Sequence, residues 1–146
     1  RMGATRYEHD VLAWAREQAQ LLRSGRYAEL DIEPLAGEIE DVGKSEQRDL
    51  ASRMAALLAH LLKWQYQPER RGNSWRRTIA GQRENLAKRL TRTPSLKPDL
   101  NDPEWLREVW NDALELAWKE TGQELPFPEY CPWTVAEILD AQWLPE

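Results

Sequence analysis

The sequence contains few of the residue types from which catalytic and metal-binding sites are most often built. It has one cysteine, Cys131, and two histidines, His9 and His60, in 146 residues. A single cysteine excludes an internal disulfide and any cysteine-rich metal site, and it makes a reducing cytoplasm the expected compartment. The two histidines lie far apart in the sequence, and no activating pattern surrounds Cys131.

Long apolar runs and catalytic motifs are also missing. No stretch approaches the roughly 20 apolar residues needed to cross a bilayer, and the first ten residues lack the apolar core of a secretory signal. No Gly-rich phosphate loop, GxSxG, HExxH or CxxC motif is present. We therefore expect no membrane partner and assign no cofactor and no metal, and the sequence favours a protein that is not an enzyme.

What the sequence does contain is typical of a helical globular protein. Hydrophobic residues make up 41% of the chain and charged residues 31%, which argues against a disordered tail. A length of 146 residues suffices for one domain with a real core and is too short for two ordinary domains. We therefore expect a single helical domain over residues 1–146.

The strongest helical pattern lies in the middle of the chain. Apolar residues recur at steps of three and four from Leu50 to Trp64, which places them on one side of a helix. The same phase extends back through Leu35, Ile39 and Val42 without a slip. This predicts one long helix over residues 32–67, with a break at residues 43–45 as the alternative, because glycine costs about 1 kcal/mol inside a helix.

Capping signals place a helix near the start of the chain. Thr5 and Glu8 form a capping-box pattern, so the first helix is expected to begin directly after Thr5 and to end at Gly25. The short segment that follows predicts a single helical turn. Tyr27 and Leu30 are its expected anchors.

Further signals place three helices after the long one. The pattern predicts helices over residues 75–92 and from Pro103 to Gly122, the latter capped by Asp102. Thr134 and Glu137 form a second capping box before a short helix over residues 135–140. The predicted fold is all-α: an antiparallel four-helix, bundle-like core with one long central helix and an irregular C-terminal cover ending in a short helix.

The net charge of −5 is unevenly distributed. Residues 29–49 carry eight acids against two bases, whereas residues 69–97 carry nine bases against two acids. We favour pairing between elements of opposite charge over a nucleic-acid footprint, so nucleic acid is not an expected partner. The acids expected to face the basic third helix lie along one side of the fourth helix: Glu104, Glu108, Asp112 and Glu115.

Several strings resemble a known family. They are HLLKWQYQPERR with the following SWRRTI, the earlier EIEDVGKSE, PSLKP, and the CPWT…LPE ending. These strings resemble a bacterial family catalogued as domain of unknown function 29, and the similarity covers nearly the whole chain. The resemblance implies an all-helical fold and a bacterial origin. It implies no activity, because the family is named for lacking one.

Polar residues along the edge of the long helix form the first candidate site. Glu46, Arg53 and His60 follow one another at seven-residue steps, and Gln82 is expected opposite His60 if the next helix runs antiparallel. We favour a hydrogen-bonded network that sets the register of the helices, including a pair between Asp49 and Arg53. The alternative is a metal or acid–base site. The candidate polar site comprises Glu38, Asp41, Glu46, Arg53, His60 and Gln82.

The second candidate site is the basic, aromatic corner between the long helix and the third helix. Arginines beside tryptophans suit anion or nucleic-acid contact, and a helix N-terminus lies there. We favour a structural interpretation, in which Trp64 and Trp75 cap the core and the cations cover them while pairing with acids of the fourth helix or the C-terminal segment. The candidate anion-binding residues are Lys63, Arg70, Arg71, Trp75 and Arg76.

Eight tryptophans are many for a chain of this size. Trp105, Trp118 and Trp143 lie at the margins of the apolar stripes, so self-association through exposed aromatics is one hypothesis and cover by the C-terminal segment is the other. The favoured function is a helical interaction module, with a homodimer as one form. The alternative is an enzyme or a small anion- or metal-binding protein with a site near His60 or the Arg70/Arg71/Trp75 corner.

Overall fold

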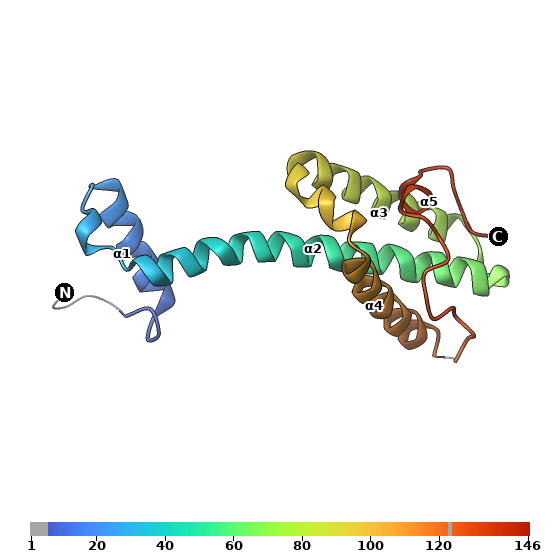
Figure 1. Cartoon of the computed structure of the whole chain (residues 1–146). Coiled ribbons are helices and arrows are strands. Elements are labelled where there is room, and N and C mark those ends of the chain that lie inside the picture. Colours follow the sequence, from blue (N-terminus) through green and yellow to red (C-terminus); the bar gives the residue numbers. More distant parts are fainter. Residues whose placement is uncertain (1–5, 123) are drawn as a thin grey trace. The chain divides into compact units, whose positions relative to one another are not determined.

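The computed structural model describes residues 6–122 and 124–146, and these ranges contain helices and loops but no strand (Figure 1). The chain divides into two compact units, which we call the first unit (residues 1–45) and the second unit (residues 46–146). The prediction of a single domain over residues 1–146 stays a prediction alongside this division. None of the helices in the described ranges combines the length and apolar character needed to cross a membrane.

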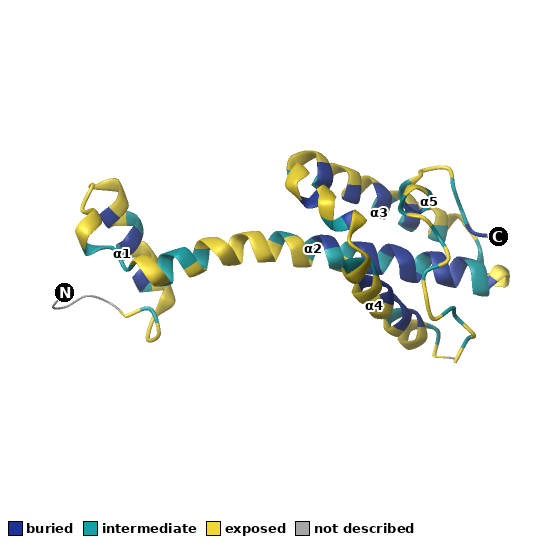
Figure 2. Ribbon diagram, in the orientation of Figure 1, coloured by how far each residue is buried: buried dark blue, intermediate teal, exposed yellow. Residues whose placement is uncertain are grey.

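The long central helix is α2 (Ile32–Tyr66), with 35 residues. Its backbone is helical throughout residues 43–45, so the prediction of a continuous helix is confirmed. Burial changes along it. Figure 2 shows mostly exposed residues in its first half and mostly buried residues in its second half.

The first unit contains α1 (Val11–Arg23), the single turn η1 (Tyr27–Glu29) and the beginning of α2. Helix α1 starts later than predicted, because Asp10 is its N-cap. The Asp10 side chain accepts a hydrogen bond from Ala13 N at 3.1 Å. Thr5, the predicted cap, lies outside the described residues. Gly25 has a φ of 73° and follows the end of the helix, as predicted.

Trp14 is the main buried side chain of the first unit, with 1% of its surface exposed. Its indole Nε1 donates to Asp31 Oδ2 at 2.7 Å. The rings of Trp14 and Tyr7 pack edge to face, with their centres 4.8 Å apart. Gln18 Oε1 accepts from Asp31 N at 2.9 Å. Tyr27, a predicted anchor, is instead 64% exposed, and η1 contains no buried residue.

The second unit contains the remainder of α2, the turn η2 (Pro68–Arg70), α3 (Asn73–Arg92), η3 (Pro94–Asn101), α4 (Pro103–Thr121) and α5 (Val135–Leu139). Figure 1 shows α3 running back along α2. The predicted caps are present: Asp102 accepts from Glu104 N, Gly122 adopts a φ of 64° after α4, and a capping box starts α5.

One hydrophobic cluster holds the second unit together. It draws on α2, α3, η3, α4 and α5, and residues of the C-terminal segment, among them Phe127, Trp133 and Trp143, pack against it. The all-α, bundle-like fold with a C-terminal cover is thereby confirmed. Among the described residues, α1 contributes none to this cluster, since its buried side chains Trp14 and Leu21 lie in the first unit.

A substitution at Gly81 tests the helical backbone of α3. A methyl group at this position would have no neighbour within 4 Å, so alanine fits without a shift. We expect Gly81→Ala to raise the free energy of unfolding by about 1 kcal/mol, because glycine disfavours a helix interior by that amount. Chemical denaturation measures the change. The neighbouring exposed Ala80→Gly should lower stability by a similar amount, and a loss of stability in Gly81→Ala would contradict the open surface at this position.

Candidate functional site

Charged residues join α2 to α3 in the second unit. Arg89 of α3 forms ion pairs with Glu46 at 2.8 Å and with Asp49 at 2.6 Å. Arg53 Nε donates to Asp49 Oδ2 at 2.8 Å, which is the pair expected from the sequence. These groups are partly exposed, so each pair contributes about 0–1 kcal/mol and serves mainly to set the register of the two helices.

His60 and Gln82 lie opposite each other, as the antiparallel arrangement predicts. Gln82 Nε2 is 3.3 Å from His60 Nδ1, and the same ring nitrogen is 3.0 Å from the Ala56 carbonyl oxygen. Partial burial lowers the pKa of His60, and the charge of Lys63 lowers it further, while the Ala56 carbonyl and Glu120 act in the opposite direction. His60 is half-buried rather than largely buried, because it lies at the edge of the contact between α2 and α3.

The remaining two candidates, Glu38 and Asp41, belong to the first unit. There the Tyr7 hydroxyl donates a hydrogen bond to Glu38. That bond raises the pKa of Tyr7, and burial and the charges of both carboxylates raise it further. The six candidate residues are therefore divided between the units, two in the first and four in the second.

The chemistry open to the four residues in the second unit follows from their partners. Glu46 and Arg53 are engaged in ion pairs. His60 Nδ1 lies within hydrogen-bond distance of the Ala56 carbonyl oxygen and of Gln82 Nε2, and its tautomer decides which of the two it bonds. Within the described ranges, no three side chains of His, Cys, Asp or Glu are grouped so that they could hold a metal ion. The arrangement suits a network that positions helices, and a catalytic or binding role for these residues stays a prediction.

The basic corner is built around two tryptophans. Lys63 is 8% exposed, pairs with Glu120 of α4, and lies 5.8 Å from the centre of the Trp75 ring. The guanidinium carbons of Arg71 and Arg76 lie 5.2 Å and 4.9 Å from the Trp64 ring. The cations thus cover the indoles, as in the structural interpretation that the sequence favours.

Backbone oxygens hold one of these arginines in place. Arg71 donates from Nε to Trp64 O at 2.7 Å and from Nη2 to Glu146 O at 3.2 Å, which ties the C-terminal segment to the end of α2. Arg70 and Arg76 are exposed. Lys63 and Arg71 are thus engaged within the protein, whereas Arg70 and Arg76 are open to solvent. Anion binding at this corner stays a prediction.

The basic third helix pairs with a different element from the one predicted. Among the described residues, its ion pairs to another helix reach Glu46 and Asp49 of α2, whereas the acids of α4 from Glu104 to Glu115 are exposed. The expectation that these acids face α3 was wrong, because α3 packs on α2 with Arg89 toward the acidic part of that helix. The acid of α4 that does form an ion pair is Glu120, with Lys63.

Arg83 is the structural residue that sequence reasoning missed. It is 5% exposed, and its Nε donates to the Ile138 carbonyl at 2.8 Å, which connects α3 to α5. Burial lowers the pKa of Arg83, and the charge of Asp140 opposes this. The sequence does indicate its position. Arg83 shares the three- and four-residue spacing of Ile79, Leu86 and Leu90, which places it on the buried side of α3.

The tryptophans at the stripe margins contact the C-terminal segment. Trp143 packs edge-on against Trp133 at 5.6 Å, and Trp118 donates from Nε1 to Leu125 O at 3.0 Å while lying 5.6 Å from Phe127. Trp105 is half-buried against the hydrophobic cluster. This geometry supports the cover hypothesis for Trp118 and Trp143, and self-association through the three rings stays a prediction.

Replacing His60 tests its structural role. We expect His60→Ala to lower the free energy of unfolding by about 1–3 kcal/mol at neutral pH, because Gln82 then lacks its ring partner. Since the pKa of His60 is lower in the folded protein, wild-type stability should be fully present above the ordinary pKa of about 6.5 and fall as pH drops below it. The variant should lose this part of the pH dependence.

Urea titrations from pH 5 to pH 8 measure both effects for His60. The exposed His9→Gln controls for removal of a histidine. Unchanged stability of His60→Ala, together with loss of a bound metal, would reverse the assignment.

The basic strip of α3 and η2 tests for nucleic-acid binding. We expect weak retention of DNA or RNA at low ionic strength and none at about 0.15 M salt, where the screening length is about 8 Å. The acidic remainder of the chain repels phosphate outside this strip. Gel-shift titration measures the affinity. Tight binding at that salt, lost on changing Arg70, Arg71 and Arg76 to Glu, would show that the strip is a nucleic-acid site.

Comparison with known proteins adds one finding. The sequence model of the family described as "Domain of unknown function DUF29" matches residues 6–144. Comparisons with curated proteins and with solved structures found no match. The family match extends over both units, from before α1 to the C-terminal segment, and agrees with the resemblance carried by the sequence motifs. The chain therefore belongs to the family described as domain of unknown function DUF29.

Proposed function

We propose that this protein is a helical interaction module and that its docking surface is an apolar stripe on the first half of α2. The stripe consists of Ile32, Leu35, Ile39 and Val42, spaced as the a and d positions of two heptads. Ile32, Ile39 and Val42 are 61%, 70% and 67% exposed. Leu35 is half-buried and lines a pocket with residues of α1. The three exposed side chains at coiled-coil spacing are the observation that carries the proposal.

The two flanks of the stripe differ. On one flank, Asp31 and Glu38 are hydrogen-bonded to Trp14 and Tyr7, so the α1 side is already occupied. The other flank carries the small residues Ala36 and Gly43, and a methyl group at Gly43 would have no neighbour within 4 Å. A helix can therefore approach closely from this second flank without displacing a large side chain.

We infer that the occupant is a second copy of the chain. The spacing of the stripe reads the same in both directions, so two copies related by a two-fold axis place Ile32 opposite Val42 and Leu35 opposite Ile39. Burying a valine or isoleucine side chain stabilises an assembly by about 1.5–3 kcal/mol, and each such contact occurs twice in a symmetric dimer. The stripe thus supplies its own complement.

A charge within the stripe tests the proposal. We expect the wild-type chain to dimerise and Val42→Glu to weaken the dimer by about 100-fold or more, because two carboxylates enter the apolar seam. Sedimentation equilibrium measures the dissociation constant. Ser45→Glu, also exposed on α2, adds the same charge outside the stripe and should leave the dimer intact.

Both variants change exposed side chains, so the helical content of each chain should match the wild type by circular dichroism. A wild-type chain that sediments as a monomer into the millimolar range would overturn the homodimer. Equal dissociation constants for Val42→Glu and Ser45→Glu would show that the dimer, if formed, uses another surface.

We further infer a bacterial source and a reducing cytoplasm as the setting of this module. The motif resemblance supports the first inference, and the single Cys131 supports the second.

A further inference from the structure

The second unit contains an apolar groove of about 470 Å³ between α2, α4 and the C-terminal segment. Its size falls within the roughly 300–1,000 Å³ of typical small-molecule sites. Most of the lining is hydrophobic, with two indoles among the wall residues, which include Met54, Leu58, Trp110, Trp133, Val135 and Ile138. The rings of Trp110 and Trp133 meet edge to face, with their centres 5.6 Å apart. Trp110 is 1% exposed, whereas Trp133 is half-buried and is the more accessible indole at the groove.

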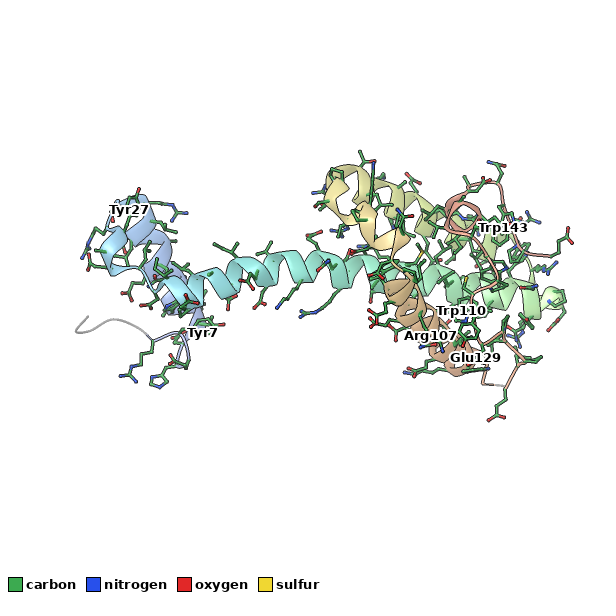
Figure 3. All side chains as sticks on the ribbon, viewed as in Figure 1. Tyr7, Tyr27, Arg107, Trp110, Glu129 and Trp143 are labelled. Carbon is green, nitrogen blue, oxygen red and sulfur yellow. The ribbon has the colours of Figure 1, made fainter. Side chains whose placement is uncertain are left out.

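One cation lies at the groove. Arg107 of α4 is among the lining residues, and its guanidinium carbon is 4.3 Å from the centre of the Tyr130 ring, which also lines the groove. Figure 3 labels Arg107 beside Trp110 and Glu129. A carboxylate oxygen of Glu129 is 3.9 Å from Arg107 Nη2, which is beyond hydrogen-bond distance. Both side chains are solvent-accessible, at 45% and 76%.

Two other polar side chains of the groove, Thr134 and Cys131, are already engaged. The Thr134 hydroxyl forms the capping box with Glu137, and Cys131 Sγ donates to the Trp133 carbonyl oxygen at 3.5 Å. Burial raises the pKa of Cys131, so its thiol stays neutral near pH 7. The guanidinium of Arg107 is therefore the charge that a ligand in this groove would meet within the described part of the chain.

We propose that this groove binds a small hydrophobic monocarboxylate. The apolar body lies against the half-buried indole of Trp133, and the carboxylate accepts hydrogen bonds from Arg107 in place of the loose contact with Glu129. A neutral molecule of the same shape lacks the charge–charge attraction to the guanidinium, and a cation is repelled by it. A phosphate or a dicarboxylate would bring more charge than one arginine neutralises, into a groove that is otherwise apolar.

A matched pair of probes tests the proposal. We expect 2-naphthoate to bind the full chain more tightly than 2-naphthalenemethanol, which has the same ring system without the charge. Arg107→Gln should weaken naphthoate by about tenfold or more and change the alcohol by less than about twofold, because it removes one charge-assisted contact. Isothermal titration calorimetry measures both. Arg77→Gln, an exposed arginine outside the groove, is the control and should change neither.

Two further variants separate the charge from the cavity. Glu129→Gln should strengthen naphthoate binding by several-fold, because it removes the carboxylate that competes for Arg107. Val135→Trp fills the groove and should abolish binding of both probes, while the Arg107 and Glu129 variants, at exposed positions, keep the wild-type melting temperature. Failure of wild type to bind naphthoate, equal affinity for the alcohol, or unchanged affinity in Arg107→Gln would each overturn the proposal.

Discussion

Burial of the second half of α2 is the interaction on which the second unit depends. Leu50, Met54, Leu57 and Leu61 are each 0% exposed, and the cluster around them includes residues of every other helix of that unit that packs on the core. At about 25 cal/mol per Å² of apolar surface, this stripe supplies the main stabilising term for α3, α4 and α5. The short α5, with five residues, could not persist without such packing.

The two halves of α2 have the same apolar spacing but differ in burial. Both carry an apolar stripe at helical spacing, yet one half is surrounded and the other is left open at Ile39 and Val42. Helix propensity cannot explain this difference, because a helical stripe states only which side is apolar. In the open half, Trp14 of α1 and Tyr7, which precedes α1, cover one flank. The uncovered remainder is what makes an interaction module the best-supported function.

Four arginines of the second unit differ in the groups that they contact. Arg71 is fixed by carbonyl oxygens and a tryptophan ring, Arg83 donates to Ile138, and Arg89 bridges two carboxylates. Each of these cations donates at least one hydrogen bond or ion pair to another group of the protein. Arg107 differs, because it lies on Tyr130 with only a distant carboxylate nearby and an apolar groove beside it. This contrast supports the proposed role of Arg107 in ligand binding.

The sequence by itself determined the features set by near neighbours along the chain. The continuity of α2, the Asp102 cap, Gly122 after α4 and the capping box of α5 all follow from hydrogen bonds and periodicity within a few residues. The antiparallel turn also made the approach of Gln82 to His60 predictable. Local chemistry was sufficient for each.

Only the tertiary structure decided which elements meet. It placed Trp14 outside the main cluster, exposed Tyr27, paired Arg89 with α2 rather than with α4, and buried Arg83. It also formed the groove beside Arg107 from three segments far apart in the sequence. An apolar stripe in the sequence shows which face of a helix is apolar, but it does not show which element packs on that face. A charged residue likewise does not show which residue it pairs with. Both are settled by packing through space.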